Sequence, residues 1–342
     1  MKMNNEDKYL ESIGIVKIKE LDNEIKNNMV TKFMNILFNT FQNHNFDAKR
    51  INRCLLSAKM YIADFKKNLG SASYFYKSNS IYIDKDANFE ELDDYIIHEF
   101  IHCIQDIRID KNYNRIGLCT ISEFKIHGLA LNEAAVQYIT SKMLNRKLEE
   151  INYRIVILKT RSKEYYPLLS NLVEQIIYLY GEYNIVESTI NGSYNFQEQY
   201  IEICSEKDFN KLENNIDKVL DIRNKLSQGI DYDNQIEKIV SQYFVTQEII
   251  FTSYFNRKLS KIENLDEIDL YKSKLEGYRE LLGSDGDYKF FENFKKDKLK
   301  MLKNRMINIM RKDSINMPKV INKNRIFNLF RYIKSLFMKK EY

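Results

Sequence analysis

The chain has 342 residues, of which 44% are hydrophobic and 13% aromatic, which suits one large core or two smaller ones and excludes a disordered chain. Only two prolines and ten glycines interrupt it, so long helices should dominate. The net charge of +5 arises at the C-terminal end. From Lys295 onwards the chain has fifteen Lys and Arg but only three Asp and Glu. The part before Lys295 is therefore mildly acidic.

The cysteines and the N-terminus bear on the cellular compartment. Cys54, Cys103, Cys119 and Cys204 are widely spaced and form no C-x-x-C pair, so we expect reduced core thiols. The sequence begins without the apolar run of a signal peptide, and no stretch reaches the eighteen or so apolar residues of a membrane span. We therefore expect a cytoplasmic protein. Its C-terminal tail is a separate candidate for contact with a membrane.

The first elements are predicted from periodicity. Apolar residues at helical spacing predict a helix over 23–42. Residues 58–65, 73–76 and 81–83 are rich in β-branched and aromatic side chains, which favour strands. The turn-forming stretch 77–80 separates the last two. We expect a small sheet that ends in a hairpin.

A helix is predicted from Asn88 to about Asp106. Asn88 can cap it, and Glu91 three residues later completes a capping-box-like pair. Apolar residues cover most of the circumference, so the helix should be buried on most sides.

The rest of the chain is predicted to be helical. A loop over 110–119 should lead to a helix over 122–143, whose small residues allow close approach of another helix. Beyond Arg146 the pattern is almost wholly helical, and a glycine-rich loop over 283–287 interrupts it. The expected helices cover 166–180, 194–204, 209–226, 235–259 and 265–282.

The sequence His98-Glu99-Phe100-Ile101-His102 carries the clearest chemical signal. Two histidines four residues apart lie about 40° and about 6 Å from each other on an α-helix, so both can reach one metal ion. Glu99 faces the neighbouring edge of the same helix face and can accept a proton from water at the metal. Because the chain has only four histidines, half of them fall in this one motif. We predict one zinc ion per chain.

A catalytic zinc site requires a third protein ligand and an open position. Two downstream carboxylates compete for this role, Glu123 and Glu133. Glu133 lies in Asn132-Glu133-Ala134-Ala135, where small side chains would let its helix lie against the helix that carries the histidines. This favours Glu133 over Glu123.

The two segments together resemble the gluzincins, the thermolysin-like zinc peptidases. In that family an H-E-x-x-H helix is followed by a glutamate ligand on a later helix, often within N-E-A. The resemblance covers about a sixth of the chain. It implies His98, His102 and Glu133 as zinc ligands and Glu99 as general base. The family's acid one turn after the third ligand is replaced here by Gln137, which can accept a hydrogen bond from the first histidine but lacks the charge.

The resemblance also implies a reaction. Zinc-activated water would attack a peptide bond, with Glu99 as general base. A further group should stabilise the oxyanion, and the candidates are His127 and Tyr166, with Tyr138 and Tyr165 as further possibilities. The aminopeptidase motif G-x-M-x-N is absent, which favours an endopeptidase. Strand 81–83 would be the edge strand that pairs with an extended peptide substrate.

The basic tail has its own pattern. Residues 325–340 place apolar side chains on one broad side with lysines and arginines between them, which is typical of a helix lying on an anionic membrane. A terminal helix packed on the body explains the pattern equally well. Nucleic-acid binding through the lysines of 295–303 is a weaker alternative, because no nucleic-acid-binding fold accompanies them.

Together these observations predict an α+β protein. A zincin-like catalytic domain would cover 1–146, a helical region completing the cleft 147–290, and a basic amphipathic tail 291–342. The predicted function is that of a zinc-dependent peptidase acting on peptides or proteins. The alternatives are a catalytically inactive zincin-fold protein that serves as a metal-containing binding or scaffold protein, and a host-directed protease exported without a signal peptide.

Overall fold

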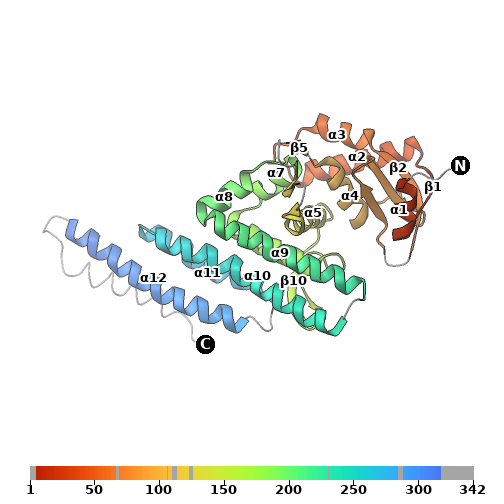
Figure 1. The fold of residues 1–342 in the computed structure, drawn as a ribbon. Coiled ribbons are helices and arrows are strands. Elements are labelled where there is room, and N and C mark those ends of the chain that lie inside the picture. Colours follow the sequence, from red (N-terminus) through yellow and green to blue (C-terminus); the bar gives the residue numbers. More distant parts are fainter. Residues whose placement is uncertain are drawn as a thin grey trace.

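The computed structural model shows an α+β protein (Figure 1), as the sequence predicts. It describes residues 5–66, 69–105, 107–109, 114–122, 126–229, 232–283 and 288–316. The early helices and the first sheet lie together at one end, the long C-terminal helices are stacked at the other, and α5 (Leu129–Met143) lies between them. The predicted tail helix over 325–340 falls outside the described residues.

The N-terminal part matches the predicted order closely. The predicted helix over 23–42 is present as α2, and the three predicted strands are present as β2, β3 and β4. The elements up to the histidine-bearing helix are α1 (Asn5–Ile13), β1 (Ile15–Glu20), α2 (Asn23–Thr40), α3 (Ala48–Ser57), β2 (Lys59–Phe65), β3 (Ala72–Phe75), β4 (Ser80–Asp84) and α4 (Asp94–Ile104).

The first sheet has the strand order β1-β2-β4-β3. Strands β3 and β4 form the predicted antiparallel hairpin, with Tyr74 opposite Ile81, whereas β2 and β4 run parallel. The expectation that strand 81–83 is the edge strand is wrong, because β4 lies between β2 and β3. The edge beside α4 is β3, and α4 packs against it.

Helix α4 begins later than predicted. Its N-cap is Asp93, whose carboxylate accepts from the Ile96 N–H at 2.9 Å. The amide oxygen of Asn88 instead accepts from the Glu90 N–H at 3.0 Å in a turn before the helix. The side chain of Asp93 is therefore the capping group, and the residues from Asn88 to Leu92 connect β4 to the helix.

A second sheet replaces much of the predicted loop over 110–119 and the first turns of the helix predicted over 122–143. Its antiparallel order is β5-β6-β7-β8, formed by β5 (Ile107–Ile109), β6 (Asn114–Ile116), β7 (Cys119–Ile121) and β8 (Ile126–His127). Helix α5 therefore starts at Leu129, after Gly128 with φ +72°, a conformation that suits glycine.

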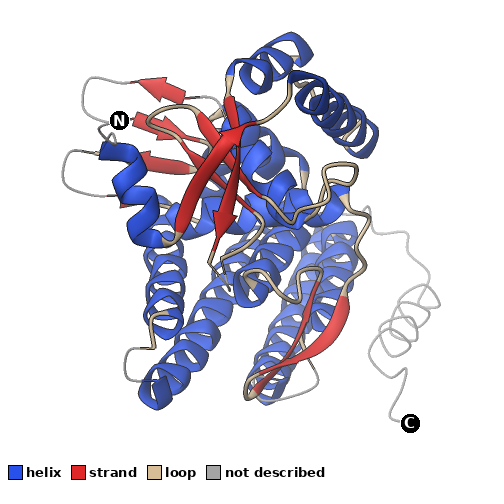
Figure 2. Cartoon of the chain, turned by 90° about the vertical axis from the view of Figure 1, so that its right-hand side faces the viewer, coloured by secondary structure: helices blue, strands red, loops and turns tan. Residues whose placement is uncertain are grey.

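In its described residues the C-terminal part is helical except for one hairpin that the sequence analysis missed. Strands β9 (Glu149–Tyr153) and β10 (Val156–Thr160) pair in antiparallel fashion, and Figure 2 shows them against the long helices, apart from the first sheet. The helices that follow are α6 (Pro167–Tyr180), α7 (Tyr183–Asn191), α8 (Asn195–Ile203), α9 (Glu206–Ser227), α10 (Tyr232–Lys261), α11 (Leu265–Tyr278) and α12 (Tyr288–Asn316), with a short 3-10 turn at Arg279–Leu281.

One continuous hydrophobic cluster runs from Leu21 to Ile309 through both parts of the chain. Helix α5 packs against α4, α6, α7 and α9, so it is enclosed on nearly all sides. All four cysteines are free. Cys103, Cys119 and Cys204 are buried, as predicted, whereas Cys54 is only partly buried, contrary to the prediction of a core thiol. Among the described helices, none combines the length and the apolar character needed to cross a membrane.

Candidate metal centre

Helices α4 and α5 bring three candidate metal ligands together. On α4, the Nε2 atoms of His98 and His102 lie 3.0 Å apart. On α5, the carboxylate of Glu133 lies 3.3 Å from the His98 Nε2 and 3.4 Å from the His102 Nε2. His98 is buried, with 1% of its side chain exposed, whereas the side chains of His102 and Glu133 are 17% and 16% exposed. The group is therefore enclosed on one side and open on the other.

Two glutamine amides orient the two imidazoles. Gln137, one turn after Glu133, donates from Nε2 to the Ser162 hydroxyl at 2.9 Å, so its oxygen accepts from the His98 Nδ1–H at 2.9 Å. Gln105 donates to the Asn132 side-chain oxygen at 2.8 Å and accepts from the His102 Nδ1–H at 2.9 Å. Each Nδ1 atom thus carries a proton, which leaves each Nε2 atom, directed at Glu133, as the position that can bind a metal.

The donor set fits a tetrahedral zinc ion. Four ligands about 2.0 Å from zinc lie about 3.3 Å from one another in a tetrahedron. The two Nε2 atoms lie 3.0 Å apart, the Glu133 Oε2 lies 3.3 Å from that of His98, and the Glu133 Oε1 lies 3.4 Å from that of His102. Two neutral imidazoles and one carboxylate also match the ligand types that zinc prefers in sites with an open position. Among the described residues, these three form the one group of His, Cys, Asp or Glu side chains so placed.

The charges within the group are strongly coupled. Burial opposes the charged form of Glu133, yet the two adjacent imidazoles hold the pKa of its carboxyl well below the usual range. Burial likewise lowers the pKa of His102, but the Glu133 carboxylate outweighs this effect and raises it to about 9. Glu133 is therefore ionised, and protons compete with a metal for the His102 imidazole.

Glu99 lies beside this group and is held by the backbone of the edge strand. Its Oε2 accepts from the N–H of Tyr74 on β3 at 2.8 Å. Burial raises the pKa of the Glu99 carboxyl, although the neighbouring His102 and His98 act in the opposite direction. The carboxyl thus has a stronger tendency to take up a proton than an exposed glutamate.

Two neighbouring tyrosines lie beside His98. The ring centroids of Tyr165 and Tyr166 lie 4.9 and 6.4 Å from that of His98. Burial, together with the nearby Glu133 carboxylate, raises the pKa of Tyr166 to about 12, so its hydroxyl keeps its proton. Tyr166 has φ +52°, a strained conformation for a tyrosine. Both phenols can therefore act as donors at the site.

The other predicted residues lie differently. His127 pairs with Thr120 in the second sheet and lies near Asp217 of α9. The hydroxyl of Tyr138 donates to Glu182 at 2.6 Å, which directs it to another part of the molecule. The competing ligand candidate Glu123 falls outside the described residues.

The sequence analysis missed three groups that shape the site. Gln105 follows His102 by three residues, and this helical spacing could have identified it as a partner. The N–H of Tyr74 and the hydroxyl of Ser162 come from a strand and from the end of a hairpin. Their approach depends on the tertiary fold, so no local pattern could have revealed it.

Searches against protein-family models, curated proteins and solved structures found no match to this chain.

Proposed function

We propose that this chain is a zinc-dependent peptidase. The observation that carries the proposal is the convergence of the His98 and His102 Nε2 atoms with the Glu133 carboxylate, at separations of 3.0 to 3.4 Å, beside the carboxylate of Glu99. A site that only stabilises the fold does not require a general base beside its ligands. The gluzincin-like spacing of the two motifs supports the same proposal.

In this proposal each residue has one role. His98, His102 and Glu133 hold zinc, and zinc supplies Lewis acidity that lowers the pKa of water and polarises a carbonyl. Glu99 accepts a proton from the attacking water and returns it to the leaving amine. The N–H of Tyr74 keeps the Glu99 carboxylate in place through the bond of 2.8 Å.

Substrate would lie along β3. This strand forms an edge of the first sheet. An extended peptide can add to such an edge through hydrogen bonds to the main-chain groups other than the Tyr74 N–H, which Glu99 engages. Such bonds can bind an internal stretch of a peptide as well as its ends. This arrangement therefore favours an endopeptidase. The hydroxyl groups of Tyr165 and Tyr166 are the candidate donors to the oxyanion.

The test combines metal analysis with cleavage. Purified wild type is compared with His98→Ala and Glu133→Ala for zinc content and for cleavage of a broad peptide library. We expect about one zinc per chain in the wild type, its loss in both variants, and cleavage by the wild type alone. A wild type that binds zinc but cleaves no peptide would instead support the alternative, a metal-containing binding or scaffold protein.

A further inference from the structure

A second site lies away from the metal centre, where the end of α10 meets the start of α11. A cavity of about 340 Å³ opens there, within the size range of small-molecule sites, roughly 300–1,000 Å³. Its walls include the buried rings of Tyr254, Phe255 and Tyr271, and Leu270 stands exposed beside them. The cavity thus offers apolar surface to a ligand.

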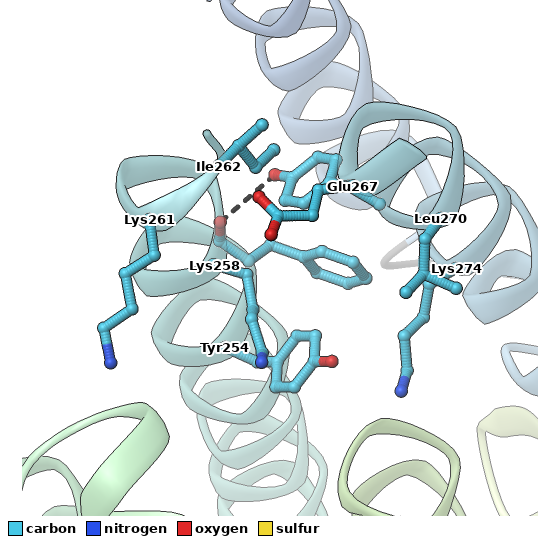
Figure 3. A pocket seen from close by; sticks show the side chains of 9 residues that line it. Tyr254, Lys258, Lys261, Ile262, Glu267, Leu270 and Lys274 are labelled. Carbon is cyan, nitrogen blue, oxygen red and sulfur yellow. Dashed lines mark hydrogen bonds between the residues drawn. The ribbon is translucent and has the colours of Figure 1, made fainter. Parts of the chain in front are cut away.

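Three lysines and one glutamate supply the charges of this cavity. Lys258 and Lys261 come from α10, and Lys274 comes from α11. Figure 3 shows these three side chains extending in the same direction, with the ring of Tyr254 between Lys258 and Lys274. The ammonium groups of Lys258 and Lys274 lie 5.9 and 5.2 Å from the centroid of the Tyr254 ring. Two cations, Lys258 and Lys274, therefore flank the aromatic ring of Tyr254.

Within the described part of the chain, the positive charges of these lysines have no ion-pair partner. The fourth charged lining residue, Glu267, accepts from the Glu263 N–H at 2.7 Å at the start of α11. Three lysines and one glutamate leave a net charge of +2. Burial and the charge of Lys258 lower the pKa of Lys274, as expected for crowded cations.

Hydrogen-bond donors remain for a ligand. Lys274 donates to the Leu179 carbonyl at 2.8 Å, and Lys261 donates to the Glu202 carbonyl at 2.9 Å. Each ammonium group has three donors, so both lysines can also bind an anion. Tyr254 adds a hydroxyl group and a ring face.

We infer that this cavity binds a small organic phosphate. A phosphate monoester carries a charge of about −1.5 to −2 at pH 7, which matches the uncompensated +2. Lysines bind phosphate as point charges, and the exposed side chain of Leu270 beside the Tyr254 ring would hold the apolar part of the ligand. This site stands independently of the proposed peptidase function.

Calorimetric titration of the full chain tests this inference, with adenosine monophosphate as the probe and adenosine as the uncharged comparison. We expect one nucleotide per chain, at least tenfold weaker binding in Lys258→Gln and in Lys274→Gln, and no binding of adenosine. Lys238→Gln removes the same charge from an exposed position on α10 and should leave the affinity unchanged. Tyr254→Phe, which keeps the packing, provides a variant if a lysine variant fails to fold, and should weaken binding measurably.

Two results would overturn the inference. The first is no binding of the nucleotide at millimolar concentration together with no binding of vesicles that contain phosphatidic acid. The second is equal weakening by Lys238→Gln, because a general effect of the basic chain would then explain the binding. Phosphatidylcholine vesicles with and without phosphatidic acid separate the two sources of a phosphate monoester. If the acidic vesicles bind and this binding depends on Lys258, the ligand of the site is a lipid headgroup. If the nucleotide binds and the vesicles do not, the ligand is a free organic phosphate.

Discussion

Amide side chains orient both histidines of the candidate metal centre. Gln137 and Gln105 each accept an Nδ1–H at 2.9 Å. A neutral amide can fix the orientation of the imidazole through this hydrogen bond, but it adds no negative charge and raises the basicity of the ligand less than a carboxylate does. We therefore expect the orientation of the histidines to be firm and the affinity for zinc to be moderate.

The amide of Gln137 is directly testable. Gln137→Leu removes the acceptor of His98 and the donor to Ser162, so the imidazole loses its fixed orientation. We expect zinc affinity to fall about 10- to 100-fold, measured by competition with a chromogenic chelator. Gln242→Leu, which removes an amide bound to Asn215, is the control. An unchanged affinity in Gln137→Leu would show that the amide does not orient the ligand.

Glu213 should make stability depend on pH. Burial, with the nearby charge of Asp217, raises the pKa of its carboxyl from 4.5 to about 7. Between these values the folded state binds more protons than the unfolded state, so the free energy of unfolding falls as the pH rises from 5 to 8. In the wild type the free energy of unfolding should fall by on the order of 2 kcal/mol between these two pH values. Glu213→Gln should not show this fall, as measured by urea unfolding at both pH values. Parallel pH profiles of wild type and variant would contradict this prediction.

At the scale of elements, α5 sets the position of Glu133 and of Gln137. Its first N–H groups are capped from α9, because the Asp217 carboxylate accepts from the Gly128 N–H at 3.1 Å and from the Ala130 N–H at 2.9 Å. This is a capping interaction between residues far apart in sequence. It links the long helices of the C-terminal part directly to the candidate metal centre.

Removal of this cap should destabilise the fold. For Asp217→Ala we expect a loss of about 1–2 kcal/mol in the free energy of unfolding, measured by urea titration. Asp217→Asn keeps an acceptor and should lose less. Asp221→Ala, an exposed position one turn later on the same helix, should have little effect. Equal losses in Asp217→Ala and Asp221→Ala would argue against capping as the cause.

Local patterns predicted the elements of the site better than its surroundings. The spacing of His98 and His102 on a helix and the small residues around Glu133 are properties of short segments, so the sequence could indicate both. The same holds for the hairpin of β3 and β4. The contact of Glu99 with the Tyr74 N–H depends on how the sheet and α4 pack, which no local pattern encodes.

The missed strands have a physical explanation. Strand β9 contains Glu149 and Glu150 and is mostly exposed, so it lacks the apolar alternation that marks a strand. Strands β5 to β8 have only two or three residues each, too few to show a period. The start of α4 was misplaced because both Asn88 and Asp93 are capable caps, and tertiary contacts select Asp93.

At the scale of the whole molecule, one continuous hydrophobic cluster joins the two parts, and the candidate ligands come from helices inside it. Metal binding should therefore stabilise the entire fold. Free zinc at 100 times its Kd would add about 2.7 kcal/mol, so chelation should lower the melting temperature by about 4 °C. His98→Ala should show no such response. An equal effect of chelator on that variant would place the stabilising metal elsewhere.

The most direct test of the peptidase proposal is the cleavage rate of zinc-loaded Glu99→Gln beside the wild type. The amide oxygen of glutamine can still accept from the Tyr74 N–H, so the geometry and the zinc content should be preserved, whereas the amide cannot accept the proton of water. We predict a loss of cleavage of about 10²- to 10⁴-fold, with Glu91→Gln unchanged. Full cleavage by Glu99→Gln at equal zinc content would contradict the proposed role of Glu99 and with it the peptidase mechanism.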